Sequence, residues 1–327
     1  MIGKALSRTM LTLAATLAVG LTLAACGDDD DETTGDDGGE TASTAIEANP
    51  DNEGIELTIG SKNFDEQFIL GEIYAQALEA AGYTVNKDLN LGSEQIALRA
   101  LSSGEVDGYP EYTSTALTSF FGFAPEDVPG DPQQAYEDSQ DEFANEGLTA
   151  FAPTPFSSAN AVGLLTETAD ELGVASISEL EGATEDLTLA GSPECRERVD
   201  CLKGLEDNYG LSFGRFTPVD IELRYEVLDK GDADLSILFT TDGQLAESDE
   251  YTLLEDDQEL LPSGNVLFVA SEEAVEKAGP GMQETIEKVQ ESLTLEVMQE
   301  LNARVSLDRQ RPEEVAADYL QEAGYVE

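Results

Sequence analysis

The chain has 327 residues, enough for about two domains, and carries 69 acidic against 16 basic residues, a formal net charge of −53. This balance argues against nucleic acid as a partner, because phosphates require clustered Lys and Arg. Histidine is absent, which excludes Ser-His-Asp and Cys-His nucleophile systems and most zinc sites, so we expect no metal and no cofactor. The acidity is typical either of adaptation to salt or of an ordinary acidic surface.

The N-terminus has the pattern of an export leader. Residues 1–26 place Lys4 and Arg8 before an apolar run over 10–25, which is typical of a secretory signal and too short for a spanning helix. The run ends in LAAC, which resembles the lipobox of bacterial lipoproteins, so Cys26 would carry lipid; a signal peptide with a chance cysteine is the alternative. We therefore predict an extracytoplasmic protein that is lipid-anchored to the membrane.

Residues 27–54 are acidic and rich in Gly and Thr, with almost nothing to bury. Such a segment cannot offset the entropy of ordering, so we predict a disordered, solvated tether. Its aspartates lack the spacing of a calcium loop.

From Ile55 onward, short apolar strands alternate with helices, which predicts an α/β fold. The strand IELTIGS runs into a helix in which Asn63 and Glu66 have the spacing of a capping box, and Gly82 ends that helix. The strand YTVNKDLNL follows. The helix SEQIALRALSSG then ends at Gly104 and leads into the strand VDGYPEY.

A second stretch repeats this alternation, with strands expected at NAVGLLT, DLTLAGS and ADLSILF and a helix over 221–230. It contains Cys195 and Cys201 in SPECRERVDCLKG. Two cysteines this close in an exported chain indicate a disulfide, and metal binding by the two thiols is the alternative. The chain is almost wholly helical after the segment LPSGNVLFVAS.

The two stretches resemble each other in detail. LTIGS echoes LTLAGS, and LSSGEVDGYPEYTST echoes LDKGDADLSILFTTD, so that Asp107 aligns with Asp234 and Tyr112 aligns with Phe239. Ligands of open α/β sheets bind beyond the carboxyl ends of the strands. Two similar lobes that face each other would therefore place Tyr112 and Phe239 in one cleft.

Four stretches resemble the substrate-binding proteins of glycine betaine, carnitine and choline ABC importers: IGSKNFDEQFILGEIYAQAL, LNLGSEQIALRALSSGEVDGYPEYTST, PECRERVDCLKGLEDNYGL and TTDG. The resemblance covers nearly all of 55–327 and implies the periplasmic-binding-protein fold, in which two crossing strands join two α/β lobes around a ligand cleft. It places lobe I at 55–153 and 263–327, and lobe II at 154–262.

The resemblance also implies a small zwitterionic ligand. A quaternary ammonium cannot donate hydrogen bonds and is recognised by aromatic faces, whereas a carboxylate needs cationic or hydroxyl donors. The carboxylate-holding residues of the family correspond to Lys62, Thr115 and Arg198. Apart from the resemblance, we expect Gln67 to reach the cleft from the first helix, and Asn63 either to reach the cleft or to cap that helix.

The cation cage differs from the family pattern. Family members have tyrosine at four places, and Tyr112 retains one of them. Asn160, Phe239 and the position near Ser263 or Gly264 stand where the other tyrosines are expected. The resemblance therefore supports a carboxylate-bearing ligand better than a trimethylammonium head.

The implied function is that of a monomeric receptor that closes around its solute and delivers it to the membrane subunits of an ABC permease. A protein for another small carboxylate or amino-acid-like solute, or a sensing receptor not coupled to import, is the alternative. No phosphate-cradling Gly loop or nucleophile elbow occurs in the sequence, so we expect no catalysis.

Overall fold

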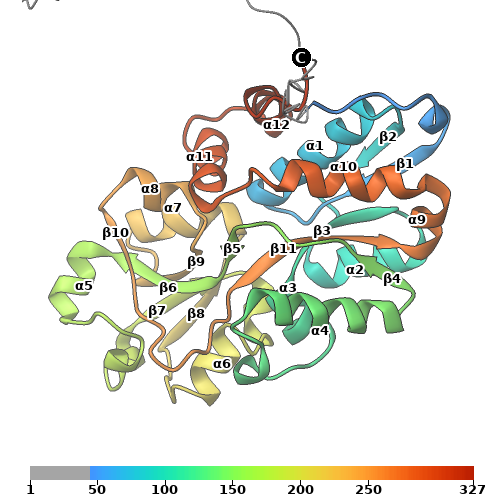
Figure 1. The fold of residues 1–327 in the computed structure, drawn as a ribbon. Helices are drawn as coiled ribbons and strands as arrows, with labels where there is room; N and C mark the ends of the chain where they lie inside the picture. The colour runs from blue at the N-terminus through green and yellow to red at the C-terminus, as the bar shows by residue number, and fades with distance from the viewer. Residues whose placement is uncertain (1–44) are drawn as a thin grey trace, which may run out of the picture. The chain divides into compact units, whose positions relative to one another are not determined.

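The computed structural model describes residues 45–327 and forms two β-sheets covered by helices (Figure 1). The predicted leader with Cys26, and the predicted tether up to residue 44, lie outside the described residues. The prediction of a disordered tether is wrong for residues 45–54, because this part packs on the first lobe: the backbone N of Ile46 donates to the backbone O of Tyr325 at 2.8 Å, and the backbone N of Asn49 donates to the backbone O of Ala81 at 3.0 Å. Both sheets belong to the same unit of the chain. Within the described range, no helix is long and apolar enough to cross a bilayer.

The first sheet has the strand order β2-β1-β3-β11-β4, and β5 pairs with β11. Its strands are β1 (Glu56–Gly60), β2 (Thr84–Asp88), β3 (Gly108–Tyr112), β4 (Leu148–Ala150), β5 (Ser157–Ser158) and β11 (Gly264–Ser271). The helices of this first lobe are α1 (Asp65–Ala80), α2 (Glu94–Ser103), α3 (Thr113–Thr115), α4 (Pro132–Asn145), α9 (Glu272–Ala278), α10 (Pro280–Gln290), α11 (Leu295–Ser306) and α12 (Pro312–Glu322). The strand β1 is parallel to β2 and β3, whereas β11 is antiparallel to β3 and β4.

The second sheet has the order β10-β6-β9-β7-β8. Its strands are β6 (Asn160–Leu165), β7 (Thr188–Gly191), β8 (Arg215–Pro218), β9 (Leu235–Phe239) and β10 (Tyr251–Leu253). The helices of this second lobe are α5 (Thr166–Leu172), α6 (Leu202–Asp207), α7 (Arg224–Asp229) and α8 (Gly243–Glu247). Short helical turns complete the two lobes: η1 (Pro50–Asn52), η2 (Ala116–Phe120), η3 (Pro125–Asp127), η4 (Ser178–Leu180), η5 (Thr184–Asp186), η6 (Pro193–Arg196) and η7 (Ile221–Leu223).

The two sheets repeat one topology, as the alignment of the two sequence stretches predicts. The order β2-β1-β3-β11-β4 corresponds to β8-β7-β9-β6-β10, and the fourth strand is antiparallel to its neighbours in both sheets. The backbone N of Thr58 donates to Oδ2 of Asp107 at 2.7 Å, and the backbone N of Thr188 donates to Oδ2 of Asp234 at 2.7 Å. The aligned aspartates therefore make the same strand-to-strand contact in both lobes.

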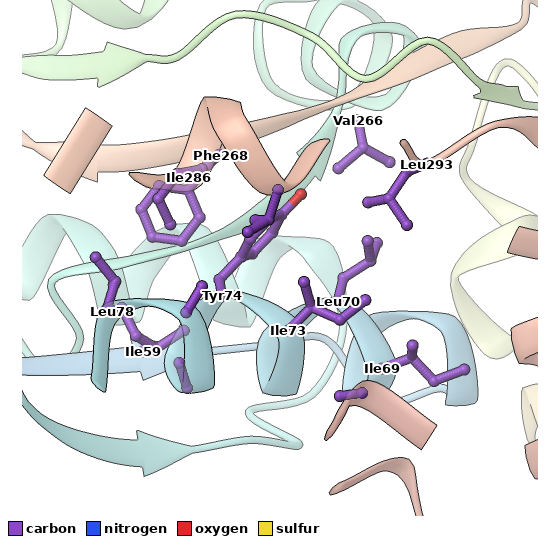
Figure 2. Close-up of a cluster of buried hydrophobic side chains, with 14 of the residues drawn as sticks. Ile59, Ile69, Leu70, Ile73, Tyr74, Leu78, Val266, Phe268, Ile286 and Leu293 are labelled. Carbon is purple, nitrogen blue, oxygen red and sulfur yellow. The ribbon is translucent and has the colours of Figure 1, made fainter. Parts of the chain in front are cut away.

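The core of the first lobe follows from the two-residue period of β11. One face of β11 packs into the hydrophobic cluster covered by α1 and α10, through Val266, Phe268 and Ala270. The other face packs into the cluster covered by α2 and α4, through Leu267 and Val269. Figure 2 shows Tyr74 beside Phe268 in the first of these clusters. Because both faces of the sheet are buried, the strand ends that carry the site rest on a rigid support.

The start of α1 differs from the sequence prediction. The N-cap is Phe64, whose side chain makes no capping hydrogen bond, so the capping box predicted from Asn63 and Glu66 is wrong. The reason is that the Glu66 carboxylate accepts a hydrogen bond from the hydroxyl of Tyr112 instead of turning back to the start of the helix. This frees Asn63 to line the space between the lobes.

Candidate functional site

A cavity of about 90 Å³ lies between the two lobes at the carboxyl ends of their strands. Six of the seven predicted ligand contacts line this cavity: Lys62, Tyr112, Thr115, Asn160, Arg198 and Phe239. The first three come from the first lobe, and the others come from the second lobe. The structure thus brings together, from opposite lobes, residues that are far apart in the sequence.

Gln67 is the exception. It is fully buried and does not line the cavity, and its Oε1 accepts a hydrogen bond from the backbone N of Lys62 at 3.1 Å. Gln67 therefore lies behind the wall of this cavity, and its contact with a ligand stays a prediction. One turn into α1, its side chain lies behind the loop that carries Lys62, and it supports that loop.

Lys62 follows β1 and is almost completely buried. Its Nζ forms an ion pair with Glu111 and lies 4.4 Å from the centroid of the Tyr112 ring. Burial lowers the pKa of Lys62, and the Glu111 carboxylate opposes that shift. Glu111 also accepts hydrogen bonds from the hydroxyl of Tyr109 and the backbone N of Tyr112, so the carboxylate that holds Lys62 is itself fixed.

Tyr112 ends β3 and is held at its hydroxyl. The hydroxyl donates to Oε1 of Glu66 at 2.6 Å, and Oε2 of Glu66 accepts from Nδ2 of Asn302 at 2.8 Å. Burial raises the pKa of Glu66, and burial together with the nearby Glu66 raises the pKa of Tyr112. The orientation of the ring is therefore set by a buried hydrogen-bond chain.

Three aromatic rings line the cavity, and sequence reasoning found two of them. The ring of Phe64 stacks on Tyr112 with centroids 6.4 Å apart and lies 5.4 Å from the ring of Phe239. Phe64 thus joins the two predicted rings into one wall across both lobes. The signal was present in SKNF, because the motif places an aromatic residue directly after the strand end that carries Lys62.

Arg224 is a second residue that the sequence prediction missed. It begins α7, and its guanidinium carbon lies 3.9 Å from the centroid of the Phe239 ring. Its Nη2 pairs with Oδ1 of Asp242 at 2.9 Å, and its Nε donates to the backbone O of Ile221 at 2.6 Å. Asp242 also accepts from the backbone N of Phe239 at 2.8 Å, so the cation, the ring and the carboxylate form one assembly.

Arg198 lies in the loop closed by the disulfide between Cys195 and Cys201. Its Nε donates to Oδ1 of Asp200 at 2.8 Å, and its Nη2 pairs with the other carboxylate oxygen. Burial lowers the pKa of Arg198, but the Asp200 carboxylate outweighs it and raises that pKa overall. Nδ2 of Asn160 donates to the backbone O of Asp200 at 3.0 Å, which ties the loop to β6.

The cavity therefore combines three kinds of group. Its cations can donate hydrogen bonds to an anionic group of a ligand, and hydroxyls such as that of Thr115 add neutral donors. Its aromatic wall can pack against an apolar or cationic group of a ligand. Each of the cations Lys62, Arg198 and Arg224 has a carboxylate partner inside the protein. The site can accept a ligand of zero net charge without leaving a buried charge unpaired.

Comparison with known proteins identifies the class of molecule that carries this site. A family model described as the substrate binding domain of ABC-type glycine betaine transport systems matches residues 55–322. The chain belongs to this family. It is a substrate-binding protein of ABC transporters, as the sequence resemblance predicts.

Individual family members support the same assignment. The glycine-betaine-binding protein of Pseudomonas aeruginosa is 33% identical over 279 residues, covering 81% of this chain and 87% of its own. The glycine betaine-binding protein YehZ of Escherichia coli is 29% identical over 284 residues, covering 83% and 91%. A crystal structure of a glycine betaine/carnitine/choline ABC transporter protein superposes with a TM-score of 0.64 at 26% identity, covering 81% of this chain and 98% of that chain. The two lobes thus form the predicted periplasmic-binding-protein fold.

Proposed function

We propose that the interlobe cavity binds a compact zwitterionic osmoprotectant that carries a carboxylate, such as glycine betaine, for delivery to a membrane permease. The observation that carries this proposal is the meeting of Lys62, Thr115 and Arg198 with the rings of Tyr112 and Phe239 in a single cavity. Relatives named for glycine betaine binding support the choice of ligand class.

The chemistry of the cavity fits such a ligand at both ends. A carboxylate is stabilised by charge-assisted hydrogen bonds from Lys and Arg, and a methylated ammonium is stabilised by aromatic faces at about 0.5 to 2 kcal/mol for each ring. The volume of about 90 Å³ is small beside the roughly 300 Å³ and more that is typical of sites for drug-sized ligands. A solute of amino-acid size is therefore the appropriate occupant.

Closure of the lobes follows from the same contacts. Lys62 and Tyr112 belong to the first lobe, whereas Arg198 and Phe239 belong to the second. A ligand that touches all four stabilises the closed arrangement over the open one by the contacts that only closure allows.

Calorimetric titration with glycine betaine and choline tests the proposal, because the two share a trimethylammonium head and only the first has a carboxylate. We expect glycine betaine to bind at least about tenfold more tightly than choline, since a charge-assisted hydrogen bond contributes about 1.5 to 3 kcal/mol. Failure to bind glycine betaine, carnitine and proline betaine would remove the osmoprotectant assignment.

Arg198→Met should abolish most of the preference for glycine betaine over choline. Arg196→Met is the matched control, because Arg196 lies in the same loop but its guanidinium packs on Phe216 outside the cavity. An equal loss in both variants would indicate damage to the loop rather than loss of a carboxylate contact.

A small carboxylate without a methylated head is the second candidate ligand. The specific observation in its favour is that Lys62 and Arg224 already lie against the rings of Tyr112 and Phe239. A quaternary head packing on those faces would have to displace them. Tighter binding of glycine or proline than of glycine betaine in the same titration would favour this candidate.

The remaining parts of the proposal rest on the sequence. The leader over 1–26 supports export, and LAAC supports lipid attachment at Cys26. We propose that the anchored receptor acts as a monomer without catalytic activity, with the lobes divided at 153/154 and 262/263. Labelling of expressing cells with radioactive palmitate, compared between the wild type and Cys26→Ser, tests the anchor directly.

A further inference from the structure

A buried hydrogen-bond chain runs from the cavity wall across to the second lobe. The hydroxyl of Tyr112 donates to Glu66 at 2.6 Å, and Nδ2 of Asn302 donates both to Glu66 at 2.8 Å and to the backbone O of Thr241 at 2.8 Å. All four residues are at least nine-tenths buried. The side-chain amide of Asn302 thus donates hydrogen bonds to Glu66 in the first lobe and to Thr241 in the second.

Asn302 occupies this place because α11 packs against α8, as Figure 1 shows, and the turn from β9 leads directly into α8. A Cβ atom added to Gly243 would lie only 2.4 Å from Cα of Ala303, so the two backbones are in close contact there. Nε2 of Gln299 donates to the backbone O of Thr240 at 3.1 Å. Three neighbouring residues of α11 therefore fix the turn over 240–243.

The turn over 240–243 adjoins the aromatic part of the second-lobe wall of the site. Phe239 directly precedes it, and Asp242 within it accepts from the backbone N of Phe239 and pairs with Arg224. Any shift of the turn relative to α11 would move the Phe239 ring and its guanidinium neighbour together. Asn302 itself does not line the ligand cavity.

We propose that Asn302 is a positioning residue that couples the first-lobe ring, Tyr112, to the second-lobe ring, Phe239, through Glu66 and the turn over 240–243. Loss of the amide leaves the buried Glu66 carboxylate without one of its donors and frees the Thr241 carbonyl at the same time. The positions of the Tyr112 and Phe239 rings are then no longer fixed relative to each other. Ligand affinity falls as a result, although no ligand contact is removed. The affinity part of this inference rests on the proposed function.

The first test compares Asn302→Leu, which keeps the branching and the number of heavy atoms of the side chain, with Gln299→Met, which removes a hydrogen bond to the same turn without touching Glu66. We expect the affinity for glycine betaine to fall by about tenfold or more in Asn302→Leu and by less than about threefold in Gln299→Met. Tyr112→Phe keeps the ring and removes its bond to Glu66. Its effect should be clearly less than additive with Asn302→Leu, because both act on one chain of bonds.

The second test needs no ligand. Amide hydrogen exchange of the ligand-free protein should accelerate in Asn302→Leu both at the turn over 240–243 and at the start of α1, but only at the turn in Gln299→Met. If the wild type binds no glycine betaine, the proposed function fails and exchange alone decides the inference. If Asn302→Leu does not fold, Asn302→Ser replaces it. Unchanged affinity, additive losses with Tyr112→Phe, or exchange confined to the turn would overturn the coupling.

Discussion

The Nζ of Lys62 lies 4.4 Å from the centroid of the Tyr112 ring, so the protein's own ammonium rests against the ring expected to receive the ligand's cation. The ion pair with Glu111 keeps it there. When a ligand enters, the same ammonium can turn its remaining donors toward a carboxylate. Under the proposed function, we therefore expect Lys62 to bind the carboxylate end of a zwitterion and to compete with its cationic end.

This arrangement predicts opposite consequences for two ligands. In Lys62→Met, glycine betaine should bind at least about tenfold more weakly, because a charged donor to its carboxylate is lost. Choline, which has no carboxylate, should lose less than about threefold or should gain, since the ring face is uncovered. Calorimetric titration measures both. The double variant Lys62→Met with Glu111→Gln controls for the buried carboxylate that the single variant leaves unpaired.

Phe64 should contribute to binding through its ring. Phe64→Ala should lower the affinity for glycine betaine by about tenfold, because Phe64 joins the walls formed by Tyr112 and Phe239. Phe64→Leu is the matched variant, since it keeps an apolar side chain and removes only the π face. Full affinity in Phe64→Leu would show that Phe64 acts by packing alone.

Gly243→Ala should destabilise the fold. The added methyl would lie 2.4 Å from Cα and N of Ala303, so α8 and α11 would have to separate. Overpacking of this kind costs about 1 to 3 kcal/mol, which thermal or urea unfolding detects as a lower free energy of unfolding. The control is Gly130→Ala, because a Cβ atom there meets nothing within 4 Å and its φ is not in the left-handed region. Equal stability of both variants would contradict close contact between the two helices.

Stability should depend on pH through Asp65. Burial and, after it, the nearby Glu222 raise the pKa of Asp65 from 3.8 to about 6, although Arg309 and Arg224 oppose the shift. The folded chain therefore holds this proton more tightly than the unfolded chain, and the contribution of Asp65 to stability declines as the pH rises from about 4 to about 6.

Asp65→Asn removes that decline. Its Tm should exceed that of the wild type above about pH 6, and the difference should shrink toward pH 4. Calorimetry between pH 4 and pH 8 measures it. Asp141→Asn, at an exposed position on α4, is the control and should show no such trend. A constant Tm difference at all pH values would mean that the charge of Asp65 is not responsible.

Much of the fold and part of the site were predictable because they depend on local patterns. The stretch GEVDGYPEYTST and its echo GDADLSILFTTD predicted two equivalent strand ends, and the structure places Tyr112 and Phe239 at those ends. Chain order and alternating strands and helices were enough for this step.

The missed residues depend on contacts that no local pattern records. Arg224 reaches the site because Asp242, 18 positions later, holds its guanidinium. Asn302 bonds Glu66 across 236 positions. The capping box failed for the same reason, because Tyr112, 46 positions away, engages the Glu66 carboxylate.

The carboxyl ends of β3 and β9 each place a cation and a carboxylate next to an aromatic ring. In the first lobe, Tyr112 has Lys62 against its face and Glu111 beside that cation; in the second, Phe239 has Arg224 and Asp242. Each lobe therefore contributes to the cleft a group of one aromatic ring, one cation and one carboxylate, whose net charge is zero. In a chain with a net charge of −53, this local pairing keeps each cation of the cleft beside a carboxylate of its own lobe. Under the proposed function, an electrically neutral solute would close the receptor by the contacts it adds, and the net charge of the cleft would stay the same whether it is empty or filled.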